Sequence, residues 1–209
     1  MGVSLLEENV GRRRPAIVPL TVEQFHRMMA TGVLREGDPI ELVDGILVYK
    51  DRGDSQGGSM HGPIHSRTVN RVQRTFRIVE GLGFFLHSQL PVTLRPIHEP
   101  EPDGAVVRGT PDDYPDRHPG PQDIRAIVEV SDSSLEYDRT TKQRIYATAS
   151  IPVYLIVNLP ETQIEVYENP LPAEGRYASR TVHKSGQTIR LTLSATAVVE
   201  VAVSDILPA

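Results

Sequence analysis

The sequence predicts an α/β (α+β) fold, in which a mixed β-sheet is flanked by helices. Short runs rich in β-branched and aromatic residues recur along the chain, which is typical of strands. Two longer segments, near 64–80 and 135–149, instead carry apolar residues at helical spacing. The central order of helix, three strands, helix and strand indicates α/β or α+β architecture with a mixed sheet.

The chain has 209 residues, which suits one domain with a sizeable core. We expect residues 1–19 to be an N-terminal lead-in and residues 20–209 to form a single domain. An Arg12, Arg13, Arg14 run lies in the lead-in, and it can be read either as a solvated tail or as a binding arm.

The composition excludes several classes of site. There is no cysteine, so disulfides and thiolate metal sites are excluded and any metal must take oxygen or nitrogen ligands. No apolar run approaches the roughly 20 residues needed to cross a bilayer, so we expect a cytoplasmic protein with no membrane partner. The net charge of −5 argues against a protein that coats nucleic acid through a basic surface. Acidic metal ligands also contribute to that total, so the charge does not exclude an enzyme acting on nucleic acid.

A short first helix is predicted after the lead-in. Thr21 and Gln24 have the spacing of a capping box, and Phe25, Met28 and Met29 follow at helical spacing. Gly32 is expected to end this helix.

A hairpin is predicted next, in IELVDGILVYK. Asp44-Gly45 is a residue pair that favours a two-residue turn between antiparallel strands. Glu41 is placed in the first strand of the hairpin. The Gly- and Ser-rich stretch 51–63 that follows is predicted to be a mobile loop beside a site.

The segment 64–80 is predicted to be an amphipathic helix. Its apolar side carries Val69, Val72, Phe76 and Val79, and its opposite side carries Arg67, Arg71, Arg74 and Arg77. The arginines can be interpreted as phosphate contacts or as a solvated helix face. His65 continues the apolar side, where it either packs in the core or points toward a cleft.

Two carboxylates in consecutive apolar strands are the most informative feature. Side chains alternate in IRAIVEV, so Glu129 faces away from Val128 and Val130 and is predicted to be partly buried. Asp103 opens the preceding strand and would lie near Glu129 if the two strands pair. Two such charges raise each other's pKa unless a cation lies between them, which favours Mg²⁺. Each acid taken alone can also be explained as a solvated strand end or a structural ion pair.

Lys142 is the third candidate, on the helix predicted for residues 135–149. It shares one side of that helix with Asp138, Ile145, Tyr146 and Ala149, so it should face the sheet. Its ammonium group could orient a nucleophilic water or stabilise negative charge on a phosphoryl group. Alternatively, it lies along apolar surface and only neutralises Glu129.

The C-terminal part of the chain predicts more strands. RYASRTV, TIRLTL and VVEVAV look like a peripheral β extension of the domain. The sequence contains no Gly-rich phosphate loop, nucleophile elbow or dinucleotide fingerprint, which excludes several common enzyme classes.

These motifs resemble a known family. IELVDGILV, the segment 101–159 and QIEVYENP are similar to the Uma-type family of putative restriction endonucleases, a branch of the PD-(D/E)XK, restriction-endonuclease-like superfamily. The similarity extends from about Thr21 to beyond Asn169. The order Pro-Asp, Glu-Val-Ser, Asp-Arg, Lys, Tyr-Ala, Ile-Pro carries most of it. Val153, Leu155 and Asn158 depart from the family pattern, as does Gly104.

The resemblance implies a restriction-endonuclease-like core and a set of site residues. Asp103 and Glu129 would hold Mg²⁺, for which Mn²⁺ could substitute, and the carbonyl of Val130 would join the metal shell. The superfamily lysine usually stands two residues after the glutamate, where this chain has Ser131. Lys142 would take its place, and Glu41 would complete the catalytic set.

The implied function is Mg²⁺-dependent endonucleolytic hydrolysis of phosphodiester bonds, with DNA as the expected partner. Candidate nucleic-acid contacts are His65, Arg67, Arg71 and Arg74, and a homodimer is compatible with the resemblance. The alternative is a catalytically inactive nucleic-acid-binding or oligomerisation module that retains the fold.

Overall fold

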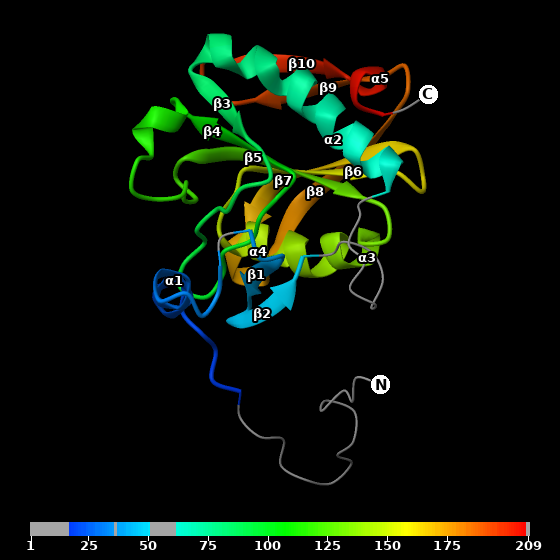
Figure 1. Cartoon of the computed structure of the whole chain (residues 1–209). Helices are drawn as coiled ribbons and strands as arrows, with labels where there is room; N and C mark the ends of the chain where they lie inside the picture. Colours follow the sequence, from blue (N-terminus) through cyan, green and yellow to red (C-terminus); the bar gives the residue numbers. More distant parts are fainter. Residues whose placement is uncertain (1–16, 36, 51–61, 208–209) are drawn as a thin grey trace, which may run out of the picture.

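A six-stranded mixed sheet forms the centre of the molecule (Figure 1). The computed structural model describes residues 17–35, 37–50 and 62–207, so residues 1–16 of the predicted lead-in and 51–61 of the predicted loop lie outside the described residues. The strand order is β3-β4-β5-β6-β7-β8; only β5 and β6 are parallel, and the other neighbours are antiparallel. The strands are β3 (Phe84–His87), β4 (Gly104–Arg108), β5 (Ile124–Ser131), β6 (Val153–Asn158), β7 (Gln163–Leu171) and β8 (Arg176–Lys184).

The N-terminal helix and hairpin form where the capping box and the Asp44-Gly45 turn predict them. Helix α1 (Val22–Ala30) begins with a reciprocal capping box between Thr21 and Gln24. Strands β1 (Ile40–Val43) and β2 (Ile46–Tyr49) form an antiparallel hairpin. Asp44 and Gly45 have φ angles of 52° and 71°, the left-handed backbone that a tight two-residue turn requires.

Helix α2 (Pro63–Phe76) packs on one face of the sheet and continues into the 3₁₀ helix η1 (Arg77–Leu82). Pro63 lies in its first turn, where a missing N–H group costs nothing. All four residues of its predicted apolar side are buried: Val69, Val72, Phe76 and Val79. They contact a core that includes Val106, Val128 and Leu155 of the sheet.

The three predicted C-terminal strands have two different partners. Strand β8 pairs with β7 and forms an edge of the central sheet. Strands β9 (Thr188–Thr192) and β10 (Val198–Ala202) form a separate two-stranded sheet on the same side as α2 (Figure 1). Together with α5 (Val203–Ile206), they bury apolar side chains in the core beneath α2.

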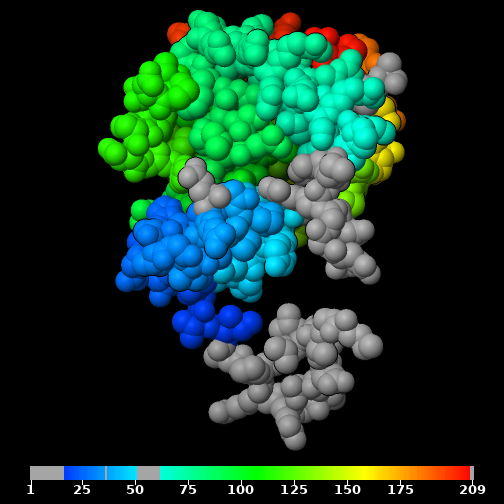
Figure 2. Space-filling view, viewed as in Figure 1, coloured from blue at the N-terminus to red at the C-terminus, as the bar shows by residue number. Residues whose placement is uncertain are grey.

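The opposite face of the sheet is covered by a broken helix and the β1–β2 hairpin (Figure 1). The broken helix consists of α3 (Leu135–Tyr137), the π-helical turn η3 (Asp138–Lys142) and α4 (Gln143–Thr148). Tyr146, Tyr154, Tyr167 and Tyr177 pack against one another in this second core. Figure 2 shows the N-terminal residues, in blue, forming the surface below the green and cyan residues that follow them.

The shorter helices complete the fold. They are η2 (Pro111–Asp113), in the connection between β4 and β5, and η4 (Pro172–Glu174), between β7 and β8. In the described ranges, every helix is too short or too polar to cross a membrane.

Candidate active site

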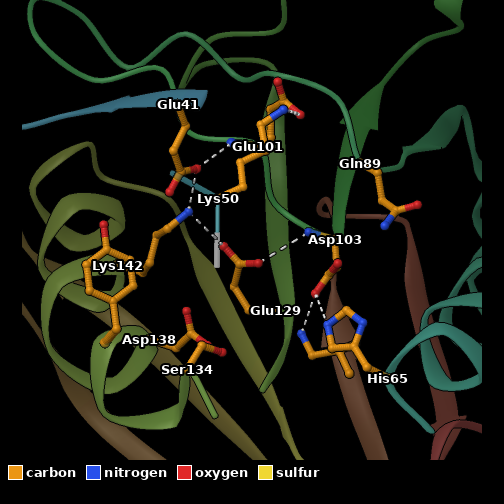
Figure 3. Close-up of a pocket in the computed structure, with 12 residues that line it drawn as sticks. Glu41, Lys50, His65, Gln89, Glu101, Asp103, Glu129, Ser134, Asp138 and Lys142 are labelled. Atoms are coloured by element: carbon orange, nitrogen blue, oxygen red, sulfur yellow. Dashed lines mark hydrogen bonds and ion pairs between the residues drawn. The ribbon is translucent and has the colours of Figure 1, made fainter. Parts of the chain in front are cut away.

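Pairing of β4 with β5 brings Asp103 beside Glu129. Gly104 lies opposite Val128 in the antiparallel register, so the residue before Gly104 falls next to Glu129. The backbone N–H of Asp103 donates to Oε2 of Glu129 over 3.2 Å. In return, the N–H of Val130 donates to Oδ2 of Asp103 over 2.8 Å (Figure 3). The two predicted acids are therefore neighbours, each held by the backbone of the other strand.

Strand alternation decides the side on which Glu129 lies. Val128 and Val130 join the core under α2, whereas Ile127 joins the core under the broken helix. Glu129 lies on the second side, is only 6% exposed, and accepts a hydrogen bond of 2.7 Å from the hydroxyl of Tyr146. Burial raises the pKa of Glu129 to about 8, with further upward contributions from the charges of Asp138 and Asp103 and a downward one from Lys142.

Lys142 lies on the broken helix and reaches the acids of the sheet and the hairpin. Its Nζ lies 2.9 Å from Oε2 of Glu41 and 3.6 Å from Oε1 of Glu129. Burial by itself lowers the pKa of Lys142, but the charges of Glu41 and Glu129 outweigh it and raise the pKa above its ordinary value. The ammonium group therefore stays charged, and it contacts Glu41 as well as Glu129. The alternative prediction, in which Lys142 only neutralises Glu129, leaves out the closer contact with Glu41.

The β1–β2 hairpin delivers Glu41 to this place. Glu41 is 4% exposed and its Oε2 also accepts a hydrogen bond of 3.0 Å from the N–H of Glu101. At the hairpin turn, Asp44 pairs with Arg144 of α4 at 2.5 Å. Lys50, just after β2, pairs with Glu101. These contacts hold the hairpin against the broken helix through Arg144 and against the segment before β4 through Glu101.

Asp138 is a site residue that the sequence interpretation did not single out as such. Its Oδ2 accepts hydrogen bonds of 2.7 Å each from the hydroxyls of Ser131 and Ser134. Burial raises the pKa of Asp138, although both serine hydroxyls oppose the shift. Ser131, two residues after Glu129, supports this third acid. The signal in the sequence was the place of Asp138 on the apolar side of its helix.

A buried cluster anchors the π turn to the sheet. The carboxylate of Glu165 in β7 is fully buried and accepts hydrogen bonds from Arg139, Arg180, Asn158 and Tyr167. Because Arg139 directly follows Asp138, this cluster holds the turn that carries both Asp138 and Lys142.

His65 lies at the site. Of the three arginines predicted to contact nucleic acid, two are exposed and one is bonded within the protein. Nε2 of His65 is 3.4 Å from Oδ2 of Asp103. Burial lowers the pKa of His65, but the hydrogen bond and charge of Asp103 outweigh it and raise the pKa overall. Arg67 and Arg74 are exposed on α2. Arg71 instead donates a hydrogen bond of 2.5 Å to the carbonyl oxygen of Leu207, so it holds the end of the chain against α2.

These side chains surround a pocket of about 320 Å³ (Figure 3). Five carboxylates, two lysines and one histidine contribute to its lining, which consists of Glu41, Lys50, His65, Gln89, Glu101, Asp103, Glu129, Val130, Ser134, Tyr137, Asp138 and Lys142. Lys50, Gln89, Glu101, Ser134 and Tyr137 were not predicted, because each depends on contacts between elements that are distant in the sequence.

The oxygen-rich lining of the pocket is chemically suited to a hard divalent cation. Carboxylate oxygens are the ligands that Mg²⁺ prefers. Burial raises the pKa of Glu129 most, the charge of Asp103 adds to the shift, and a cation between the two acids would oppose both effects. Within residues 17–35, 37–50 and 62–207, no three His, Asp or Glu side chains are already grouped to hold a metal ion. Asp103 and Glu129 instead accept hydrogen bonds from the protein, which a cation would have to replace or share.

Comparisons with known proteins identify relatives of the whole domain. The Uma2 family model, described as "Putative restriction endonuclease", matches residues 22–204. A solved structure of a putative nuclease belonging to DUF820 from Anabaena variabilis ATCC 29413 superposes with a TM-score of 0.58 and 16% sequence identity. The alignment covers 90% of this chain and 97% of that chain, which shows a shared restriction-endonuclease-like fold. A search of curated proteins found no match.

Proposed function

The chain belongs to the Uma2 family of putative restriction endonucleases, and from this premise we propose that it is a Mg²⁺-dependent endonuclease that hydrolyses phosphodiester bonds of DNA. The observation that carries the proposal is the meeting of Asp103, Glu129 and Lys142 in one pocket. Two acids on adjoining strands beside a buried ammonium group match what phosphodiester hydrolysis needs, namely a cation site and a donor for developing negative charge.

The residues have separate roles in this proposal. The carboxylates of Asp103 and Glu129 would hold Mg²⁺, or Mn²⁺ in its place, together with the carbonyl oxygen of Val130. When bound, the ion would supply positive charge at the phosphoryl group and make water a better nucleophile at neutral pH. Val130 already lines the pocket, and its N–H orients Asp103.

Lys142 acts as a charged donor rather than as a base. The carboxylates beside it hold its pKa above the ordinary value, so the ammonium group keeps its proton at neutral pH. It can donate hydrogen bonds to the attacking water or to a phosphoryl oxygen as negative charge develops there. Glu41 aims the ammonium group by pairing with it and is a candidate acceptor for a proton of the water.

DNA would approach along α2. Arg67 and Arg74 are exposed and available for phosphates, whereas Arg71 is engaged with Leu207. His65 connects this helix to Asp103. We propose a cytoplasmic setting for the enzyme, and the homodimer stays a prediction.

The proposal is tested by cleavage of supercoiled plasmid DNA with Mg²⁺ or Mn²⁺, with single-stranded RNA assayed in parallel. Asp103→Ala and Lys142→Ala should each abolish cleavage. Asp112→Ala is the matched control, because Asp112 is exposed on η2 and does not line the pocket; it should cut like the wild type. Wild-type cleavage rates in the Asp103 variant would point to a contaminating nuclease and refute the proposal.

One observation favours a second candidate, the catalytically inactive module. Asp103 and Glu129 are both hydrogen-bonded within the protein, as in a purely structural network. Such a module would bind DNA without cutting it and would bind no divalent cation. Calorimetric titration with Mn²⁺ separates the two candidates, because only the enzyme should give a binding isotherm that Asp103→Ala removes.

A further inference from the structure

The hydroxyl of Tyr137 is buried at the pocket without a hydrogen-bond partner among the described residues. A buried polar atom in this condition destabilises the protein unless something pairs with it. The four tyrosines that are buried as whole residues behave differently. The hydroxyls of Tyr146 and Tyr167 donate to Glu129 and Glu165, and those of Tyr154 and Tyr177 donate to the carbonyls of Asp138 and Ile151. The exception is the tyrosine that lines the pocket.

The surroundings of Tyr137 keep its hydroxyl proton in place. Burial raises its pKa to about 12, with Lys142 opposing the shift and Glu41 adding to it. At neutral pH the side chain is therefore a neutral donor. Tyr137 lines a pocket with five carboxylates, where a neutral donor adds hydrogen-bonding capacity for an anion without adding charge.

The π turn places Tyr137 and Lys142 on one side of the broken helix. Residues five positions apart lie about 140° from each other around an α-helix, which has 3.6 residues per turn. A π turn pairs residues five apart, and here the N–H of Gln143 donates to the carbonyl of Asp138. A π turn therefore brings residues five apart nearer to the same side of the helix than an α-helical turn does. Both Tyr137 and Lys142 line the pocket.

We propose that Tyr137 is a substrate-binding residue, whose hydroxyl donates a hydrogen bond to a phosphoryl oxygen of the ligand in this pocket. A phosphodiester oxygen carries no hydrogen, so it is held by donors, and Tyr137 and Lys142 supply two from a single helical segment. The choice of a phosphoryl oxygen rests on the proposed nuclease function. The vacant hydrogen-bonding capacity of the hydroxyl does not depend on it.

Tyr137→Phe tests the proposal, because it removes only the hydroxyl oxygen. Since that oxygen has no partner in the protein, the melting temperature without ligand should be unchanged or higher. In the presence of Mg²⁺, affinity for inorganic phosphate, measured by calorimetry, should fall about tenfold. The KM for a DNA oligonucleotide should rise by a similar factor with a smaller change in kcat. Tyr177→Phe is the matched control, since it loses a protein hydrogen bond outside the pocket and should lower the melting temperature without changing phosphate affinity.

Each outcome decides the proposal. Equal phosphate affinity in the wild type and Tyr137→Phe would overturn it, as would failure of the wild type to bind phosphate at all. If the wild type binds phosphate through Tyr137 but cuts no nucleic acid, the nuclease function fails and the donor role stands. If the wild type cuts DNA and Tyr137→Phe has the same KM and phosphate affinity, the donor role fails and the nuclease function stands.

Discussion

The ammonium group of Lys142 lies 2.9 Å from Oε2 of Glu41, although 101 residues separate the two in the sequence. This buried pair joins the β1–β2 hairpin to the broken helix directly above Glu129. It performs two tasks at once, since it closes one side of the pocket and keeps a positive charge beside the acids.

Replacing Lys142 by Met should destabilise the protein, because it leaves the carboxylate of Glu41 buried without its cation and removes the ammonium group beside Glu129. We expect the free energy of unfolding to fall by about 3–5 kcal/mol at pH 7, measured by urea denaturation. The double variant Glu41→Gln with Lys142→Met should recover part of this loss, because it removes the stranded charge. With Glu41→Gln as the second single variant, additive losses in the double variant would show that the pair is not coupled.

A divalent cation should stabilise the wild type, because it would bind the folded state between Asp103 and Glu129. At a Mg²⁺ concentration of about 100 times Kd, the gain is about 2.7 kcal/mol, visible as a higher melting temperature that EDTA reverses. Asp103→Asn should lose this shift, whereas Asp112→Asn, on the exposed η2, should keep it. A shift of the same size in the Asp103 variant would place the cation elsewhere.

Glu165 should contribute stability that disappears in acid. Burial tends to raise its pKa, but hydrogen bonds from Arg139, Asn158, Tyr167 and Arg180 outweigh burial and lower it to about 2. The unfolded chain has the ordinary value near 4.5, so the stabilisation is fully present above about pH 5 and is lost as the pH falls toward 2.

The full contribution of Glu165 is about 3 kcal/mol, from the difference between the two pKa values. It can be measured as the difference in unfolding free energy between the wild type and Glu165→Gln at several pH values. That difference should shrink between pH 5 and pH 3. A constant difference would mean that Glu165 has an ordinary pKa in the folded protein.

The arginines of α2 should separate into binding and structural residues. Arg67→Ala and Arg74→Ala should weaken DNA binding similarly for all sequences, and each should reduce the slope of log affinity against log salt by about 1. Arg71→Ala should instead lower the melting temperature, because it removes the hydrogen bond to Leu207. Arg176→Ala, whose side chain pairs with Glu174 near β8, is the control for loss of a surface charge. An unchanged salt slope in the Arg67 and Arg74 variants would exclude α2 as the DNA-binding surface.

Much of the fold could be predicted because the relevant signals are local. The Thr21 and Gln24 capping box, the Asp44-Gly45 turn and the alternation in IRAIVEV each depend on neighbouring residues in the chain. Alternation alone assigned Glu129 to the face opposite Val128 and Val130. Strand order and helix spacing supplied Asp103 and Lys142 as its partners, and the family resemblance added Glu41. The structure confirms that these four residues meet; their catalytic roles stay proposals.

Contacts between distant elements could not be predicted in the same way. The pairing of Lys142 with Glu41, the support of Asp138 by Ser131 and the unpartnered hydroxyl of Tyr137 all depend on how a helix sits on a sheet. The π turn is a further case, because one widened turn rotates every later side chain of the helix.

By itself, the sequence determined which segments are strands and helices, which face Glu129 takes and to which family the chain is similar, because hydrophobic periodicity and turn chemistry act over a few residues. The tertiary structure decided that β8 joins the central sheet, that Arg71 bonds to the carbonyl of Leu207 and that Tyr137 lines the pocket. These features depend on strand register and helix rotation, where a shift of one residue turns a side chain away from its partner.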